Sequence, residues 1–179
     1  IWYEISGVEP NQKESKYALD NGINIIGSSL KDIQQAQITF DAITLWDVLE
    51  HIKDPVNYLK SLRMFLKPNG YVFVQIPTCD SLAARVMQKK CNMFDGIEHL
   101  TLFSAKSLDS AFNSADFTKV VVKSVITDYF AFNNYLNYEN DPYMPDNDNY
   151  DLLLSLLAKD FIESSGLGYK LQACYKIKN

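Results

Sequence analysis

The sequence has few cysteines and no long apolar run, and these two absences exclude several classes of protein. Only 3 of the 179 residues are cysteine, and they show no Cys-x-x-Cys or Cys/His spacing. Neither a disulfide framework nor a zinc site is therefore expected. No stretch approaches the roughly 20 apolar residues that a membrane-spanning helix needs. We expect a cytoplasmic protein in a reducing compartment, with no membrane partner.

Positive charge is also scarce. The chain has 17 Lys and Arg residues against 22 Asp and Glu residues, which gives a net charge of -5 at pH 7, and the basic residues form no stripe. Nucleic acids and anionic membranes attract proteins through such basic patches, so neither is an expected partner. A small molecule or another protein fits the composition better.

Glycine and proline are infrequent, at 7 and 6 residues, while 47% of the chain is hydrophobic. This composition predicts one globular domain over residues 1–179 with its own core. The exception is the stretch 127–150, which is rich in Asn, Asp, Tyr and Pro and is predicted to be an irregular loop and a candidate lid. The first residues lack an initiator methionine and a signal-peptide core, so we expect that the sequence starts at an internal cut.

Short apolar runs alternate with amphipathic stretches along the chain, which is typical of an α/β fold. Strands are expected at residues 2–8, 23–26, 40–46, 71–76, 119–126 and 169–177. Helices are expected between Asn11 and Gly22, from Asp54 to a stop at residues 67–70, and at 81–90, 104–113 and 151–164, with only loose turns at 30–37. The continuous apolar run 71–76 predicts a strand that is buried on both faces of a parallel sheet.

Polar residues follow two of these strands, at the edge where open α/β sheets bind ligands. Glu9 follows the first strand, where a carboxylate can accept two hydrogen bonds from a ribose diol; the alternative is a solvated loop carboxylate. The run from Trp46 to His51 follows the third strand and gathers two acids and a histidine. This run could serve as a general base or bind a divalent metal ion. The alternative is a turn with a purely structural role that caps the next helix.

Glu98-His99 is a second acid–histidine pair, and the chain has no other histidine besides His51 and His99. Both should reach the same edge of the sheet. A neutral imidazole, with a pKa of about 6.5, can take a proton from a hydroxyl at neutral pH. The alternative is that His99 fixes its loop through a backbone carbonyl. Cys79 has no recognisable base partner, so an idle thiol is expected there.

Three stretches carry a family resemblance: residues 40–55, residues 66–70, and residues 98–117, where Ala115-Asp116-Phe117 replaces the usual Ala-Gly-Phe. Together they resemble class I S-adenosylmethionine-dependent methyltransferases, of the group that includes the ubiquinone-biosynthesis O-methyltransferases. The resemblance spans residues 7–117 clearly and the remainder loosely. It implies a Rossmann-like, doubly wound sheet, mostly parallel with an antiparallel C-terminal strand.

The same resemblance implies S-adenosylmethionine as the cofactor and methyl transfer to an oxygen, nitrogen or carbon atom of a small-molecule acceptor. It implies that the cofactor's ribose meets Glu9, its adenine meets Pro10, Ser29 and Leu30, and its methionine end meets Trp46 and Asp47. His51 and His99 are the candidate catalytic residues. In some relatives an acid-x-x-Glu-His run binds a divalent cation, and Asp47, Glu50 and His51 have this spacing, but we assign no metal here.

One family feature is absent, because the glycine-rich G-x-G-x-G turn occurs nowhere in this chain. In the family this turn follows a central strand, which lies between the strands expected here at 2–8 and 40–46. We therefore expect an incomplete domain with a hole in its sheet and weak cofactor binding. Two other functions stay open: a nicotinamide-dependent oxidoreductase that uses Glu9 for its ribose, and a non-catalytic methyltransferase-like module.

Overall fold

The structure is a computed structural model that describes residues 3–126 and 159–178. Its strands are β1 (Ser6–Val8), β2 (Asn24–Gly27), β3 (Phe40–Trp46), β4 (Leu66–Pro77), β5 (Phe117–Val125) and β6 (Lys170–Ile177). Its α-helices are α1 (Gln12–Asp20), α2 (Leu30–Ala36), α3 (Pro55–Arg63), α4 (Leu82–Met87), α5 (Ala105–Ser114) and α8 (Lys159–Ser164). The candidate lid at 127–150 and the first half of the helix expected at 151–164 lie outside the described residues.

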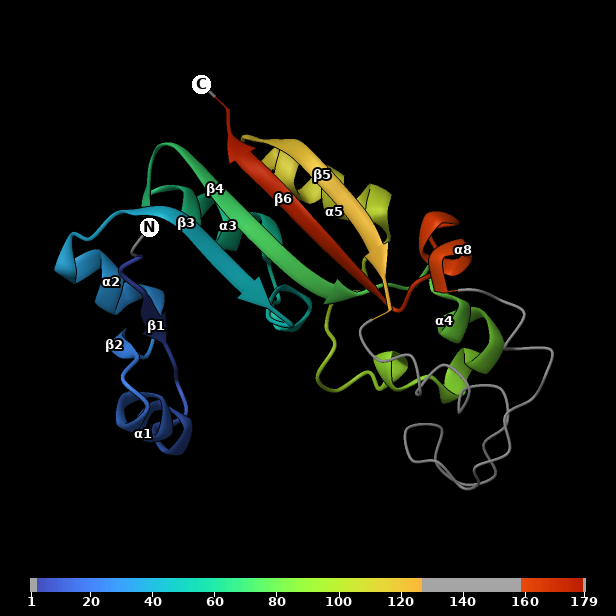
Figure 1. The fold of residues 1–179 in the computed structure, drawn as a ribbon, viewed down its shortest axis with the longest axis horizontal. Coiled ribbons are helices and arrows are strands. Elements are labelled where there is room, and N and C mark those ends of the chain that lie inside the picture. Colours follow the sequence, from blue (N-terminus) through green and yellow to red (C-terminus); the bar gives the residue numbers. More distant parts are fainter. Residues whose placement is uncertain (1–2, 127–158, 179) are drawn as a thin grey trace.

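The described strands form two separate sheets (Figure 1). The larger has the order β3-β4-β6-β5, and the smaller is the parallel pair β1-β2. β3 is parallel to β4, whereas β6 is antiparallel to both β4 and β5. Three of these four strands therefore run in one direction and the C-terminal strand runs in the other, which confirms the expected arrangement.

The break between the sheets lies between β1 and β3. Within residues 3–126 and 159–178, β3 pairs only with β4, and β1 pairs only with β2. One edge of each strand is therefore unpaired, and such edges are templates for a further strand. The break falls where the family resemblance expects a central strand, and none of the described strands lies there.

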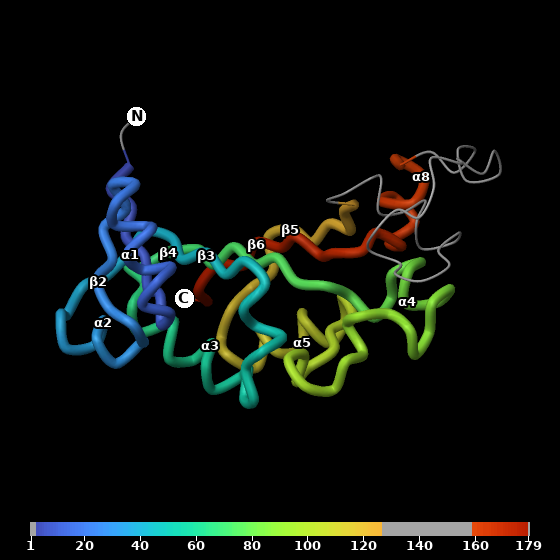
Figure 2. The backbone as a smooth tube through the Cα atoms, turned by 90° about the horizontal axis from the view of Figure 1, so that it is seen from below, coloured from blue at the N-terminus to red at the C-terminus, as the bar shows by residue number. Residues whose placement is uncertain are grey.

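The main core lies between the larger sheet and the helices α3 and α5, which cover the same face of it (Figure 2). Val72, Val74 and Ile76 of β4 are at most 1% exposed on this face. Tyr71 and Phe73 alternate with them and are 38% and 40% exposed on the opposite face. The expectation that 71–76 is buried on both faces is therefore wrong, because the described helices that pack against this part of the sheet cover one face only.

Two local expectations also need correction. Residues 30–36 form the helix α2 and not loose turns, because Ile33 is buried and Leu30 packs against the main core. Residues 67–70 do not stop the preceding helix, because α3 already ends at Arg63 and β4 begins at Leu66. Phe40 pairs with Leu66 and Ala42 pairs with Tyr71, so residues 67–70 bulge out within β4. Asn69 allows the bulge by taking a φ of 66°, a conformation that asparagine tolerates better than most residues.

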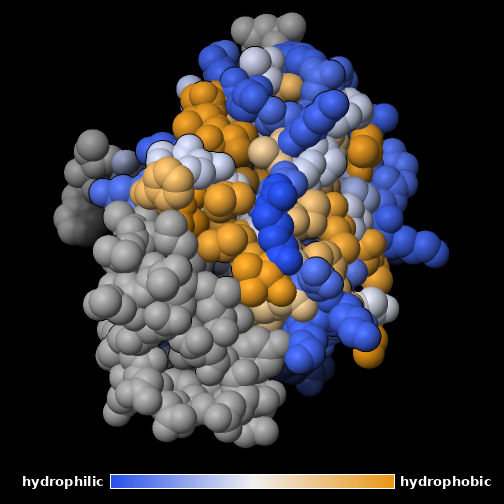
Figure 3. Space-filling model, turned by 90° about the vertical axis from the view of Figure 1, so that its right-hand side faces the viewer, coloured by the Kyte–Doolittle hydropathy of each residue, from blue (hydrophilic) through white to orange (hydrophobic). Residues whose placement is uncertain are grey.

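A second, smaller core joins α4 and α8 beyond the end of the larger sheet. Met87, Met93 and Ile162 are its most deeply buried large side chains. Figure 3 views the molecule from this end, where apolar patches lie among hydrophilic side chains. None of the helices described is long and apolar enough to cross a membrane.

Candidate functional site

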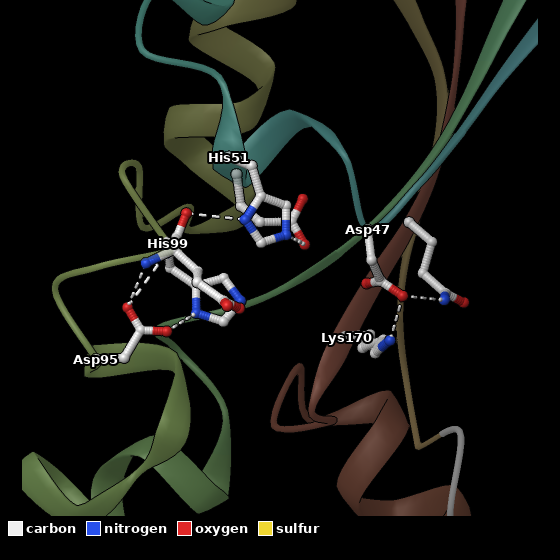
Figure 4. A network of polar contacts seen from close by, with 8 residues as sticks. Asp47, His51, Asp95, His99 and Lys170 are labelled. Carbon is white, nitrogen blue, oxygen red and sulfur yellow. Dashed lines mark hydrogen bonds and ion pairs between the residues drawn. The ribbon is translucent and has the colours of Figure 1, made fainter. Parts of the chain in front are cut away.

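The chain turns sharply where β3 ends, and Asp47 makes this turn. Its φ of 52° lies in the left-handed region, which few residues other than glycine adopt. Its N–H donates to the carbonyl of Gln75 at 2.8 Å. Its Oδ2 accepts hydrogen bonds from Gln75 Nε2 at 3.3 Å and from Lys170 Nζ at 2.5 Å (Figure 4). The carboxylate is thus fixed by β4 and β6, and its Oδ1 is buried without a partner among the described residues.

The next turn, Leu49–His51, carries a carboxyl group into the protein interior. Leu49 is fully buried in the main core, and its neighbour Glu50 is only 1% exposed. Glu50 Oε2 is buried and has no hydrogen-bond partner in the described part of the chain. Burial raises the pKa of Glu50, and the negative charge of Asp47 raises it further, although His51 and His99 act in the opposite direction.

A buried carboxylate with one oxygen left unpartnered costs stability, so we expect Glu50→Gln to stabilise the fold. The unfolded chain loses this proton around the ordinary pKa of 4.5, whereas the folded protein holds it to higher pH. The native stability therefore falls as pH rises from 4.5 through the raised pKa. Chemical denaturation at about pH 7.5 should show the variant about 1–3 kcal/mol more stable than the native protein. This difference should vanish below the ordinary pKa, and a constant difference at all pH values would contradict the explanation.

The two acid–histidine motifs meet through backbone hydrogen bonds. The carbonyl of Glu50 accepts the N–H groups of Leu100 and Thr101 at 2.9 and 3.0 Å. The Nδ1 of His51 lies 2.8 Å from the carbonyl oxygen of Glu98, 47 residues away in sequence. The rings of His51 and His99 stack with their centroids 5.0 Å apart. The expectation that both histidines reach the same place is therefore confirmed.

Asp95 holds His99 and its loop in place. Its Oδ1 accepts the backbone N–H groups of Ile97 and Glu98 at 2.7 and 2.9 Å, and that of His99 at 3.3 Å. Its Oδ2 lies 2.9 Å from His99 Nδ1. These backbone donors, the N–H of Ile97 foremost, hold the pKa of Asp95 down at about 2, so the group is ionised at neutral pH.

These partners determine which ring nitrogen of each histidine is available. A carbonyl oxygen and an ionised carboxylate can only accept, so His51 Nδ1 and His99 Nδ1 must both donate. In each neutral ring the lone pair then lies on Nε2. His51 Nε2 lies 3.9 Å from Glu50 Oε1. The site therefore offers two imidazole lone pairs beside the buried carboxyl group of Glu50. Figure 4 shows the rings of His51 and His99 next to each other.

The remaining predicted site residues lie on the smaller sheet. Glu9 follows β1, and its N–H donates to the carbonyl of Gly27 at the end of β2. Its Oε1 accepts the N–H of Asn11 at 2.8 Å, so one carboxylate oxygen is engaged and the other is left for a ligand. Pro10 is exposed beside it. No described hydrogen bond or ion pair links Glu9 to Asp47 or to the two histidines.

Ser29 precedes α2, and its turn is held by Asp32, which is not among the predicted site residues. Asp32 Oδ2 accepts the N–H groups of Ser28 and Ser29 at 2.7 and 3.0 Å, and the hydroxyls of both at 3.2 Å. These hydrogen bonds, with that of the Ser28 N–H the strongest, lower the pKa of Asp32. The sequence does indicate this role of Asp32, because Ser29 and Asp32 have the Ser-x-x-Asp spacing of a capping box.

Cys79 lies just beyond β4, and its surroundings make the thiol unreactive. Burial raises its pKa, and the charge of Asp80 adds to this effect. The thiolate, which is the nucleophilic form, is therefore disfavoured.

Comparison with known proteins identifies relatives of the chain. A family profile described as a methyltransferase domain matches residues 1–122. The ubiquinone biosynthesis O-methyltransferase of Actinobacillus pleuropneumoniae is 35% identical over 72 residues, which cover 36% of this chain and 31% of that protein. The corresponding enzyme of Serratia proteamaculans is 33% identical over 70 residues, which cover 37% of this chain and 29% of that protein. The chain thus covers about a third of the length of these curated relatives.

Solved structures show the same fold at lower identity. A SAM-dependent methyltransferase from Thermotoga maritima aligns with a TM-score of 0.63 at 18% identity, over 98% of this chain and 73% of that one. The plantazolicin methyltransferase BamL, solved in complex with a substrate analogue and SAH, aligns with a TM-score of 0.58 at 11% identity, over 98% of this chain and 68% of that one. At these identities the likeness establishes the Rossmann-like fold.

Proposed function

The chain belongs to the methyltransferase-domain family as a class I member, and from this we propose that it takes part in S-adenosylmethionine-dependent methyl transfer to an oxygen atom of a small molecule. The observation that carries the proposal is the family match over residues 1–122, which includes both acid–histidine motifs and Glu9. The choice of oxygen is supported by the curated relatives, which are named as O-methyltransferases.

The cofactor residues are proposed from their positions at strand ends. Glu9 has a free carboxylate oxygen beside the ends of β1 and β2, which suits the two hydroxyls of a ribose. Pro10 and the turn at Ser29 and Leu30 border the same end, where the adenine would lie. Trp46, which is 51% exposed, and Asp47, whose Oδ1 is unpartnered, would face the methionine end. Lys170 offsets the charge of Asp47.

The chemical step needs alignment and a proton acceptor. When bound, S-adenosylmethionine would supply the methyl group to the substrate oxygen and leave as S-adenosylhomocysteine. The sulfonium supplies most of the reactivity, and the protein orients the two reactants. The proton of the acceptor hydroxyl can pass to Nε2 of His51 or His99, because their Nδ1 atoms already donate elsewhere.

We also propose that a further strand with a glycine-rich turn, from residues outside this sequence, joins the two sheets. The unpaired edges of β1 and β3 support it. The face of the larger sheet that points away from α3 and α5 also supports this proposal, because Trp46, Tyr71 and Phe73 are 38–51% exposed there. The similar structure from Thermotoga maritima, 73% of which this chain covers, is longer than this chain.

Calorimetric titration with S-adenosylhomocysteine tests the function directly. A form of the protein extended upstream of Ile1 should bind it in a 1:1 complex. An absence of binding at millimolar ligand would overturn the proposal. Binding of a nicotinamide dinucleotide in its place would favour an oxidoreductase, which could use Glu9 in the same way.

Replacement of Glu9 by glutamine should weaken S-adenosylhomocysteine binding about tenfold in that extended form, since a hydrogen bond to a charged group contributes about 1.5–3 kcal/mol. The amide would keep one acceptor oxygen but lose the charge and the second acceptor. Glu14→Gln, a change of the same kind on the exposed surface of α1, is the matched control and should leave the affinity unchanged. Equal affinities of all three proteins would show that Glu9 does not hold the ribose.

A further inference from the structure

We infer that Lys170 is a specificity-determining residue that binds the carboxylate at the methionine end of the cofactor. The inference rests on the proposed function, because this end is the amino-acid part of S-adenosylmethionine. Lys170 is not one of the predicted site residues, and it lies 123 residues beyond Asp47 in the sequence. The fold brings the two side chains together, with Lys170 Nζ 2.5 Å from Asp47 Oδ2 (Figure 4).

The antiparallel direction of β6 places Lys170 at the ligand-binding edge of the larger sheet. Lys170 is the first residue of β6, and it pairs with Pro77, the last residue of β4. The start of β6 therefore lies beside the carboxyl end of β4, and open α/β sheets bind ligands at the carboxyl ends of their parallel strands. Lys176, near the other end of β6, pairs instead with Tyr71.

The ammonium group of Lys170 has hydrogen-bond donors that the protein does not use. An ammonium group has three N–H donors, and one of them is directed to Asp47. The other two have no protein partner within residues 3–126 and 159–178, although the side chain of Lys170 is only 19% exposed. Polar groups that are largely buried are usually paired. These donors therefore indicate a ligand that accepts hydrogen bonds at this place.

A row of side chains across the sheet holds the partner of Lys170 in position. Gln172 Nε2 donates to Gln75 Oε1 at 2.8 Å, so the Nε2 of Gln75 is turned toward Asp47 Oδ2, to which it donates at 3.3 Å. Asp47 Oδ1 is buried and has no partner in the described part of the chain. One oxygen of Asp47 is thus engaged by Lys170 and Gln75, and the other is left for a donor.

This ion pair matches the charges of an α-amino acid. The methionine end of the cofactor carries one ammonium and one carboxylate, so it needs one counter-charge of each sign. Asp47 would accept from the ammonium, and Lys170 would donate to the carboxylate through its unused N–H groups. A structural role explains the pair less well, because the desolvation of a partly buried ion pair offsets much of its attraction.

The test compares three ligands by calorimetric titration of the protein extended upstream of Ile1. S-adenosylhomocysteine carries both charges, its decarboxylated analogue carries the ammonium alone, and methylthioadenosine lacks the amino-acid part. Lys170→Met should weaken S-adenosylhomocysteine binding by about 10–100-fold, the usual effect of losing a hydrogen bond between charged groups. The affinity for methylthioadenosine should not change. The decarboxylated analogue should bind equally well or more tightly, because Lys170 no longer repels its ammonium.

Two further variants separate ligand binding from folding. Lys176→Met removes a lysine from the same face of β6, where its Nζ lies 5.9 Å from the ring centroid of Tyr71, and should change none of the three affinities. Lys170→Arg keeps the positive charge and should retain the preference for S-adenosylhomocysteine over its decarboxylated analogue.

The outcomes distinguish this inference from the proposed function. Equal losses of affinity for all three ligands in Lys170→Met would show a structural role of Lys170 and overturn the inference. An S-adenosylhomocysteine affinity that Lys170→Met leaves unchanged would overturn the inference alone, because the native protein would still bind the ligand. A native extended protein that binds no S-adenosylhomocysteine would overturn the proposed function and the inference together.

Discussion

His99→Ala is expected to lower the rate of methyl transfer in the extended protein by about 10²–10⁴-fold, which is the usual contribution of a positioned acid–base group. The loss should appear in kcat and leave the dissociation constant of S-adenosylhomocysteine unchanged, since the proposed cofactor residues lie on other segments. The imidazole of His99 stacks on that of His51 and stands beside Glu50, so its removal takes away one of the two Nε2 atoms at the site.

Asp95→Asn serves as the comparison for His99→Ala. It leaves the imidazole in place but removes the carboxylate that accepts from Nδ1, so we expect an intermediate loss of about 10–100-fold. The pH dependence of kcat should shift in this variant, which a purely structural role of Asp95 would not produce. If His51→Ala and His99→Ala both left turnover intact, neither imidazole would take part in the methyl transfer.

The sequence was sufficient to predict that the two histidines meet. Each follows a strand of the larger sheet in the chain, and segments after parallel strands gather at one edge. The partners that set their chemistry were harder to predict. Asp95 precedes His99 by four residues, but this spacing predicts a contact only within a helix, and residues 95–99 lie outside the helices. The tautomer of His51 depends on a backbone carbonyl 47 residues away, which no local pattern indicates.

The pairing of Asp47 with Lys170 is a contact that residue spacing alone does not predict. The two residues are 123 positions apart and meet only because β6 inserts antiparallel between β4 and β5. The acid-x-x-Glu-His spacing shows only which residues are near in sequence. The antiparallel strand β6 brings Lys170 to Asp47, and so the charge of this carboxylate is neutralised. In the same way, α2 forms because Leu30 and Ile33 find apolar neighbours in the tertiary structure, while its own sequence is mostly polar.

Extension of the chain upstream of Ile1, so that it includes a strand and a glycine-rich turn, should tighten S-adenosylhomocysteine binding by about 100-fold, which corresponds to about 2.7 kcal/mol. In the 179-residue chain Glu9 and Asp47 lie on separate sheets, so binding must also fix the two sheets relative to each other. A strand between β1 and β3 would make this arrangement permanent and bring backbone N–H groups to the cofactor. The amides of β3 that point away from β4 should then exchange their hydrogens more slowly.

A matched extension of the same length, composed of glycine and serine, separates the strand from mere chain length. It cannot pair stably with β1 and β3, so the affinity and the β3 exchange rates should remain those of the 179-residue chain. Equal affinity with and without the natural extension would mean that the two sheets are already positioned by α2, whose Leu30 packs against the main core. The unpaired edge of β3 would then have a different partner, and the strand proposed here would be wrong. Tight binding and slow exchange must therefore appear together, since both arise from the same backbone pairing.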